Sequence, residues 1–366
     1  MKEMKPVWVD DGHVRGYEIV QSSQQDAPLV SVIIAVYNMF EKGYLPDLLA
    51  SLCGQTLASI EFILVDDCST DCSLEWMQSQ CAGDSRFTIV RSLHNGRQGA
   101  ARNRGIEVAK GQYIGFVDAD DIIDPAYFEV LAQTAQRFNA AITVAPFRCA
   151  DSSLATVSSL IWPFSRPCED ACIIEDMNLL IMNPAHVVSS LYAASLFRKG
   201  ATRFPEDVYF EDNPTCLRLL CQARGVALVA VNSQTPAYYY RQHETSTDHR
   251  IDNLPIQIRD RIATSDFMLD DARACGYYEE YSGAIDLYYF KLCYVNTITK
   301  YALLDDWAAA DVPSIAELKR HVAERIGPLA NGSEYRRLPG KSRLKLAVIW
   351  KLPKLFLSYL RHKRNV

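Results

Sequence analysis

The sequence predicts an α/β fold with a mostly parallel, Rossmann-like sheet, and three observations support this prediction. Residues 29–36 form a continuous β-branched run, which is typical of a strand that is buried on both faces. Two further apolar runs, 60–66 and 113–117, follow along the chain, and helical patterns of about ten residues separate the runs. In such sheets ligands bind beyond the carboxyl ends of the strands, so the residues that follow each run are the first candidates for a site.

The remaining elements follow in order along the chain. Residues 1–27 are polar and aperiodic, so we expect an extension that packs loosely or on a neighbouring surface. Apolar spacing predicts helices at 45–52, 73–80, 100–110 and 213–221, and further strands at 86–90 and 226–231. Residues 253–327 carry apolar patches at helical spacing, and Pro353 is expected to split a helix near the C-terminus. We therefore divide the chain into an extension (1–27), an α/β domain (28–250), a helical region (251–340) and a basic tail (341–366).

The composition is that of an ordinary globular protein, with 49% hydrophobic and 22% charged residues. The net charge is −6, but residues 341–366 hold eight Lys or Arg and no acid, so the rest of the chain sums to −6 minus 8, or −14. An acidic body argues against nucleic acid as a partner. Eleven cysteines without metal-like spacing, and no signal peptide, predict free thiols in the cytoplasm. No apolar run is long enough to span a bilayer.

The run at 113–117 leads directly into three carboxylates, those of Asp118, Asp120 and Asp121. Neighbouring carboxylates in a partly dry site repel one another unless a cation or hydrogen-bond donors lie among them. Oxygen ligands of this kind suit Mg²⁺ or Mn²⁺. An Asp-rich turn that caps the next helix explains the same residues without a metal, and the spacing alone does not separate the two interpretations.

The residues after the first strand exclude the most obvious competing class, the dinucleotide-binding dehydrogenases. Those enzymes need a glycine-rich turn at this point, and residues 37–40 contain no glycine. The sequence also lacks the GxxxxGK[ST] phosphate loop. Phosphates would therefore be bound by a metal and by side chains such as Arg97, Arg102 and Arg104.

Four signatures, at 31–38, at 62–71, at 95–105 with 110–121, and at 209–220, resemble in order those of family 2 glycosyltransferases with the GT-A fold, a nucleotide-diphospho-sugar transferase fold. The resemblance covers about residues 28–248. It implies an inverting transfer of a hexosyl or N-acetylhexosaminyl group from a nucleotide sugar, with UDP expected as the nucleotide. The acceptor would be a hydroxyl of a glycan or lipid-linked precursor in bacterial surface polysaccharide synthesis.

The resemblance also implies roles for the residues at the strand ends. Ala35, Val36 and Tyr37 would line the base pocket, and Asp67 would bind a ring N–H. The DXD motif of the family matches residues 118–120, so Asp118, Ala119 and Asp120 would contact the donor, with Asp118 and Asp120 as ligands of Mn²⁺ or Mg²⁺. Two positions depart from the family pattern, because Ala35 stands where Pro is common and Cys68 where Gly is common.

A second group of residues completes the implied site. Glu211 and Asp212 match the acidic pair of the family, which makes Asp212 the general base and Glu211 the residue that orients it or the acceptor. The simpler interpretation is that both acids complement the start of the helix that follows. Farther on, Arg241 is expected to bind a phosphate and His243 to be a further metal ligand, and Arg97 and Arg102 complete the expected donor contacts.

The tail alternates apolar and basic residues over 341–366, which predicts an interfacial helix on an anionic membrane surface, at the inner face of the plasma membrane. A helix that docks on protein is the alternative. Two other functions stay open for the whole chain. A nucleotidyltransferase would want a phosphate loop after the first strand, and an inactive sugar-binding or scaffold protein would not need Asp118, Asp120 and Asp212 together.

Overall fold

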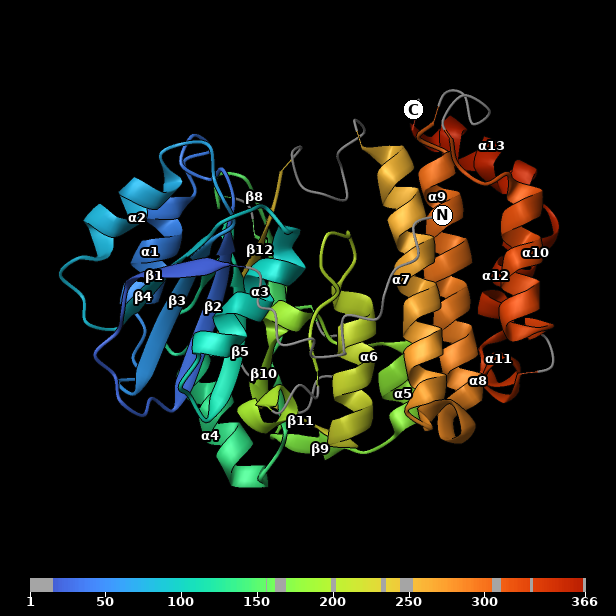
Figure 1. The fold of residues 1–366 in the computed structure, drawn as a ribbon. Coiled ribbons are helices and arrows are strands. Elements are labelled where there is room, and N and C mark those ends of the chain that lie inside the picture. Colours follow the sequence, from blue (N-terminus) through green and yellow to red (C-terminus); the bar gives the residue numbers. More distant parts are fainter. Residues whose placement is uncertain are drawn as a thin grey trace. The chain divides into compact units, whose positions relative to one another are not determined.

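The structure is a computed structural model of the whole chain. It describes residues 16–155, 157–161, 169–198, 202–231, 235–243, 253–304, 311–329 and 332–364. The chain divides into two compact units, with the division between His243 and Glu244. Figure 1 shows a sheet with helices on both faces in the N-terminal unit and helices in the C-terminal unit.

The N-terminal unit is built on a nine-stranded sheet with the strand order β1-β4-β3-β2-β5-β10-β7-β11-β9. The four strands β4, β3, β2 and β5 are parallel, and this confirms the predicted α/β class. Strands β1, β10 and β9 add antiparallel pairs at the flanks, which the apolar runs did not indicate. The strands are β1 Tyr17–Gln21, β2 Val30–Val36, β3 Ile60–Asp66, β4 Phe87–Ser92, β5 Tyr113–Asp118, β7 Ile142–Val144, β9 Cys172–Ile174, β10 Ser190–Ala193 and β11 Val226–Leu228.

A smaller three-stranded sheet, with the order β6-β12-β8, lies in the same unit. Strand β12 runs parallel to β8 and antiparallel to β6, so it joins two segments that are far apart in the sequence. Its strands are β6 Ile122–Ile123, β8 Phe147–Asp151 and β12 Tyr238–Gln242. Since β6 follows the DXD segment within two residues, this small sheet holds β12 next to it.

Helices cover both faces of the main sheet because its central strands are apolar on both faces. One face packs against α1, α2 and α4 through alternate residues of β2 and β3. On the other face α3 lies so close to β2 that a Cβ on Gly105 would stand 2.4 Å from a methyl carbon of Ile33. The helices of this unit are α1 Leu45–Cys53, α2 Ser73–Cys81, α3 Arg97–Val108, α4 Tyr127–Phe138, α5 Met177–Met182 and α6 Asp212–Ala223, with short 3-10 turns η1 Val187–Ser189 and η2 Ala194–Leu196.

Strand β1 lies within the segment that we expected to be a loosely packed extension. It pairs antiparallel with β4, with Tyr17 opposite Ser92, and Gln21 donates to the carbonyl oxygens of Cys81 and Phe87. Ile19 stays 53% exposed, so the strand is held by backbone pairing and not by burial. This is why the hydrophobic pattern did not reveal it.

The C-terminal unit is helical, as the sequence predicted for this region. Its helices are α7 Leu254–Ala274, α8 Tyr277–Tyr289, α9 Thr297–Tyr301, α10 Ile315–Ile326, α11 Ser333–Arg337, α12 Gly340–Lys351 and α13 Pro353–Arg364, with a π-helix η4 Phe290–Asn296 between α8 and α9. The expected break at Pro353 is confirmed, since α12 ends at Lys351 and α13 begins at Pro353. Among the described helices, none is both long enough and apolar enough to cross a bilayer.

Cysteine pairing differs at one described position from the expectation of free thiols. Nine cysteines, including the buried Cys81, Cys216 and Cys293, are free. Cys172, at the start of β9, is bonded in a disulfide.

Cys68 occupies a backbone conformation that favours glycine, with φ of +61°. A left-handed conformation costs a non-glycine residue roughly 1–2 kcal/mol, while glycine adds unfolded-state entropy worth roughly 0.5–1 kcal/mol. We therefore expect Cys68→Gly to raise the free energy of unfolding by about 0.5–1 kcal/mol, measured by thermal or chemical denaturation. Cys72→Gly, at a residue with φ of −79°, is the control and should give no gain. A Cys68→Gly protein that is no more stable than Cys72→Gly would contradict this account.

Candidate active site

Backbone register brings the predicted base-pocket residues to the carboxyl edge of the sheet. Ala35 on β2 pairs with Asp118 on β5, and Val36 pairs with Asp66 on β3. Tyr37 follows β2 and is 46% exposed at this edge. The three strand ends that the sequence analysis singled out therefore lie side by side.

Asp67 is braced by groups of the chain itself. Its carboxylate accepts from Nη1 of Arg104 at 3.0 Å and from the backbone N–H of Gly96 at 3.2 Å, and it is 2% exposed. Burial raises the pKa of Asp67, and the Gly96 N–H and Arg104 oppose that shift. The expected contact between Asp67 and a ring N–H of the base stays a prediction. In that contact the base would donate to a carboxylate that already accepts from Gly96 and Arg104.

Asp66 is a candidate that the sequence analysis passed over. It is 1% exposed, and its Oδ1 has no hydrogen-bond partner among the described residues. Its other oxygen accepts from the backbone N–H of Ser69 at 3.2 Å. Asp66 and Asp67 are adjacent in the sequence, and no local pattern indicates which of the two carboxylates forms the ion pair with Arg104.

Arg102 joins the two acidic motifs of the predicted site. Its Nη2 donates to Oδ1 of Asp118 at 2.9 Å, and its Nη1 donates to Oε1 of Glu211 at 2.8 Å. Gln98, one turn earlier on α3, donates to the same Asp118 oxygen at 2.6 Å. The side chain of Arg102 is only 4% exposed, so the donor contact expected of it would require these two ion pairs to open.

The acids around Arg102 differ in their environment. Burial raises the pKa of Glu211 to about 7, although Arg102 opposes the shift. Burial also raises the pKa of Asp118, and Arg102 again opposes it. Asp212, the first residue of α6, is half-buried and close enough to influence the charges of both Arg102 and Asp118. The structure thus gathers Asp118, Glu211 and Asp212 around one cation.

Strand β12 fixes the acids that follow β5. The Tyr238 hydroxyl donates to Oδ2 of Asp121 at 2.5 Å and accepts from the backbone N–H of Asp118 at 3.0 Å. The backbone N–H of Arg241 donates to Oδ1 of Asp121 at 2.7 Å. Asp121 therefore orients the segment, and burial, Asp120 and Asp118 all raise its pKa.

Arg241 and His243 were predicted to contact a phosphate and a metal. The Arg241 guanidinium donates to Asp47 at 3.0 Å and to the carbonyl of Ser152 at 3.0 Å, and it stacks on Tyr44. Arg241 is 3% exposed, and these three contacts are all with other residues of the protein. Nε2 of His243 lies 2.7 Å from Oδ2 of Asp120, which puts these two predicted metal ligands next to each other.

The carboxylate oxygen of Asp120 is a typical ligand of Mn²⁺ or Mg²⁺, whereas an imidazole nitrogen such as that of His243 suits softer divalent metals and is an unusual ligand of Mg²⁺. Oδ1 of Asp118 is taken by Arg102 and Gln98, so only its Oδ2 could serve the same ion. Within the described residues, the three His, Cys or acidic side chains whose ligand atoms lie within 4.8 Å of one another are Asp266, Cys293 and His321. That group belongs to the C-terminal unit, and its Asp266 already accepts from Tyr289 and bonds to His321.

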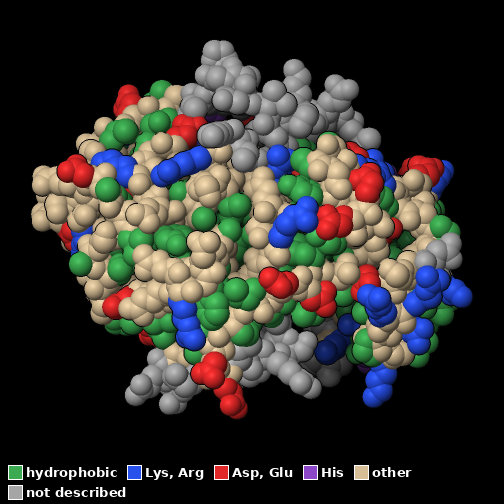
Figure 2. All heavy atoms as spheres, turned by 90° about the horizontal axis from the view of Figure 1, so that it is seen from below, with side chains coloured by type: hydrophobic (Ala, Val, Ile, Leu, Met, Phe, Trp, Pro, Cys, Tyr) green, Lys and Arg blue, Asp and Glu red, His purple; other side chains and the backbone are tan. Residues whose placement is uncertain are grey.

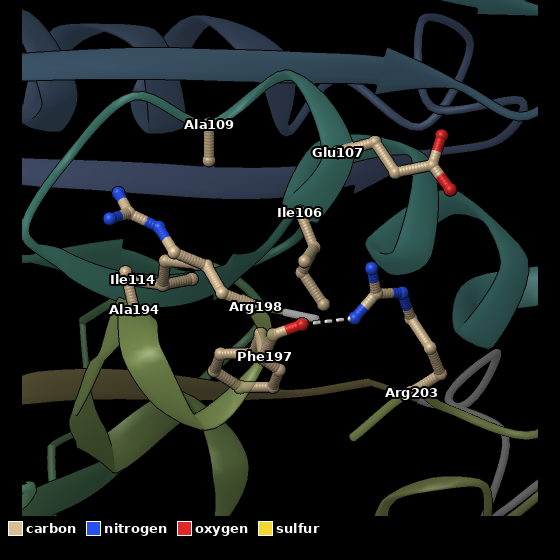
Figure 3. A pocket seen from close by; sticks show the side chains of 8 residues that line it. All are labelled: Ile106, Glu107, Ala109, Ile114, Ala194, Phe197, Arg198 and Arg203. Atoms are coloured by element: carbon tan, nitrogen blue, oxygen red, sulfur yellow. Dashed lines mark hydrogen bonds between the residues drawn. The ribbon is translucent and has the colours of Figure 1, made fainter. Parts of the chain in front are cut away.

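A separate cavity of about 290 Å³ lies at the amino end of β5, and none of the strand-end carboxylates lines it. Figure 3 shows Arg198 and Arg203 at this cavity, with Arg203 donating to the carbonyl oxygen of Phe197. Arg198 donates to the carbonyl of Gly111. Glu107, Arg198 and Arg203 are charged groups at this cavity, and none of the residues predicted to bind the donor or the acceptor lines it.

Residues 31–180 match a family model described as glycosyl transferase family 2. This part of the chain belongs to that family. The family 2 segment holds the DXD acids, Asp67 and Arg102, whereas the acidic pair 211–212 and β12 lie outside the matched range.

Two curated relatives extend the likeness beyond the family 2 segment. The putative glycosyltransferase EpsH of Bacillus subtilis is 31% identical over 231 residues, which is 62% of this chain and 64% of the relative. The uncharacterized glycosyltransferase EpsJ of the same organism is 31% identical over 227 residues, or 60% and 62% of the two chains. The match therefore spans somewhat less than two thirds of the length of each relative.

The fold is also found in a solved structure. The crystal structure of S. aureus TarS 1–349 in complex with UDP-GlcNAc superposes with a TM-score of 0.58, at 17% identity, over 92% of this chain and 91% of that one. At this identity the likeness concerns the fold, and it confirms the predicted GT-A architecture with a helical C-terminal region.

Gly99 on α3 is the contact point between this helix and the segment that carries the acidic pair. A Cβ at this position would stand 2.1 Å from the carbonyl oxygen of Pro205 and 3.1 Å from Cγ of Glu211. We expect Gly99→Ala to destabilise the unit by about 1–3 kcal/mol through overpacking, lowering the unfolding temperature by several degrees. Gly83→Ala meets nothing within 4 Å and serves as the control. Equal melting temperatures for the two variants would show that the 205–211 segment moves freely.

Proposed function

We propose that this chain is a metal-dependent inverting glycosyltransferase, which moves a sugar from a nucleotide sugar to a hydroxyl of a glycan or lipid-linked acceptor in cell-surface polysaccharide synthesis. The observation that carries the proposal is the sharing of Arg102 by Asp118 and Glu211, at 2.9 and 2.8 Å. Arg102 and Glu211 are 109 positions apart in the sequence, yet the fold joins a donor-side motif to an acceptor-side motif through one side chain. Membership of family 2 supports the same conclusion.

On the donor side, the strand ends supply the binding groups. Ala35, Val36 and Tyr37 would hold the base, and the exposed ring of Tyr37 is able to stack on it. Mn²⁺ or Mg²⁺ bound at Asp120, with His243 and Asp118, would neutralise the charge that builds on the leaving diphosphate. Arg97, at the start of α3, stacks on the ring of Tyr209, and we assign it to the diphosphate.

On the acceptor side, Asp212 is the general base. The acceptor oxygen forms a bond to the anomeric carbon while the bond from that carbon to the diphosphate breaks, and the hydroxyl proton passes to the Asp212 carboxylate. Glu211 is unsuited to this role because its carboxylate is 5% exposed and bound to Arg102. Asp212 is half-buried at the start of α6, and it is therefore more accessible to an acceptor than Glu211.

We expect Asp212→Asn to retain donor binding and to lose about 10²–10⁴-fold in the rate of transfer, since a general base contributes that much. Calorimetry with nucleotide sugars and Mn²⁺, followed by transfer assays, measures the two quantities separately. UDP-GlcNAc is the first donor to test because TarS was solved with it. Asp207→Asn makes the same chemical change in an exposed residue of the preceding segment and should leave both quantities unchanged. Undiminished transfer by Asp212→Asn would remove Asp212 from the role.

We further propose that α12 and α13 bind an anionic membrane surface at the inner face of the plasma membrane. Leu344, Leu352, Leu355 and Tyr359 are between 52% and 66% exposed, although other apolar residues of the same helices are buried. Leu355 and Tyr359 lie one turn apart on α13, and Leu352 lies between α12 and α13 with Lys351 and Lys354 beside it in the sequence. Figure 2 shows Lys and Arg side chains gathered at its right edge, the side on which Figure 1 shows α11 and α12.

Each basic residue near an anionic leaflet contributes about 1 kcal/mol, and each inserted leucine adds about 1.5–3 kcal/mol. We therefore expect Leu352→Glu/Leu355→Glu to weaken co-sedimentation with phosphatidylglycerol vesicles at least about tenfold. Leu93→Glu replaces an equally exposed leucine of the N-terminal unit and is the control. Binding of the double variant at the level of the control would favour a protein partner for this face.

A further inference from the structure

Arg102 is held by packing as well as by charge. Its guanidinium carbon lies 5.3 Å from the ring centre of Phe204 and 5.8 Å from that of Phe116. The two rings pack near the guanidinium while it donates to the two carboxylates. A cation that is 4% exposed and bound at both ends has little freedom to swing out to a ligand.

The two carboxylates belong to elements that must keep a fixed separation during an inverting transfer. Asp118 ends β5 on the donor side, and Glu211 precedes α6, whose first residue is Asp212. Without Arg102, the negative charges of Asp118, Glu211 and Asp212 would repel one another across the site. The planar fork of arginine can donate to two carboxylates at once, which the single ammonium of lysine cannot do in the same geometry.

We propose that Arg102 is a positioning residue that fixes the distance between the donor-side acid Asp118 and the acceptor-side pair Glu211–Asp212, and that it does not bind the donor diphosphate. This inference rests on the proposed function. It assigns Arg97 and the metal ligands to the diphosphate, and it gives Glu211 the task of anchoring α6 to Arg102.

The proposal predicts where a substitution acts in the kinetics. Displacing the base by about 1 Å from its reactive position costs about 10²-fold in rate. We expect Arg102→Lys to lower kcat about 10–100-fold and to change the donor Kd less than about threefold. A phosphate-binding arginine would instead raise the donor Kd and KM and leave kcat nearly unchanged.

Glu211 offers a test of the anchor from its other end. Glu211→Gln keeps an oxygen that can accept from Arg102, so we expect it to retain at least about a tenth of kcat. Glu211→Ala removes the anchor and should resemble Arg102→Lys. The double variant Arg102→Lys/Glu211→Ala should then be no slower than the slower single variant, because the two changes break the same contact.

Hydrogen exchange of residues 205–212 supplies a readout that does not depend on transfer. Arg102→Lys should speed exchange of these amides, and Arg198→Lys, which changes an exposed arginine of the same unit, should not. If the wild-type protein neither binds nucleotide sugars nor transfers, the proposed function has failed, and the exchange experiment still decides the role of Arg102. Unchanged exchange in Arg102→Lys, or a defect confined to donor Kd, overturns the positioning role.

Discussion

Two carboxylates share one buried guanidinium in the N-terminal unit, and the surrounding packing follows from that arrangement. A buried cation is stable only when its charge is matched and its N–H groups are bonded, and Asp118 and Glu211 do both for Arg102. Helix α3 must therefore approach β2 and the 205–211 segment closely, which requires Gly105 and Gly99 at its contact points. The two ion pairs of Arg102 and the two glycines of α3 thus act together. They set how closely α3 approaches β2 and the 205–211 segment.

Part of the strained backbone lies around the same site. Of the nine described non-glycine residues with left-handed φ values, five lie in its segments: Asn38, Cys68, Arg97, Asp207 and Phe210. Each costs about 1–3 kcal/mol and persists only where its surroundings over-determine it. Asn38 shows how this is achieved, because its backbone N–H donates to Ser69 and its side chain exchanges hydrogen bonds with Thr70. The loops after β2 and β3 are therefore linked to each other by hydrogen bonds.

The arginines of the site serve mainly to hold acids in place. Arg104 pairs with Asp67, Arg102 with Asp118 and Glu211, and Arg241 with Asp47. This leaves less positive charge for a diphosphate than the count of basic residues suggests. This agrees with the proposed function, in which a divalent cation near Asp120 and His243 neutralises the phosphate charge and the arginines hold the acidic side chains in position.

The sequence by itself determined the α/β class, the central strands, the break at Pro353, the family and the set of acids at the strand ends. Each of these depends on a local feature of the sequence, such as a β-branched run, a proline that lacks a backbone N–H, or a carboxylate directly after a strand. Only the tertiary structure decided that β1 is an edge strand, that Arg102 and Arg241 face inward, and that Glu211 and not Asp212 carries the ion pair. Their partners lie up to 194 positions away, and a side chain's partner is chosen by the packing of distant elements, which residue spacing along the chain does not record.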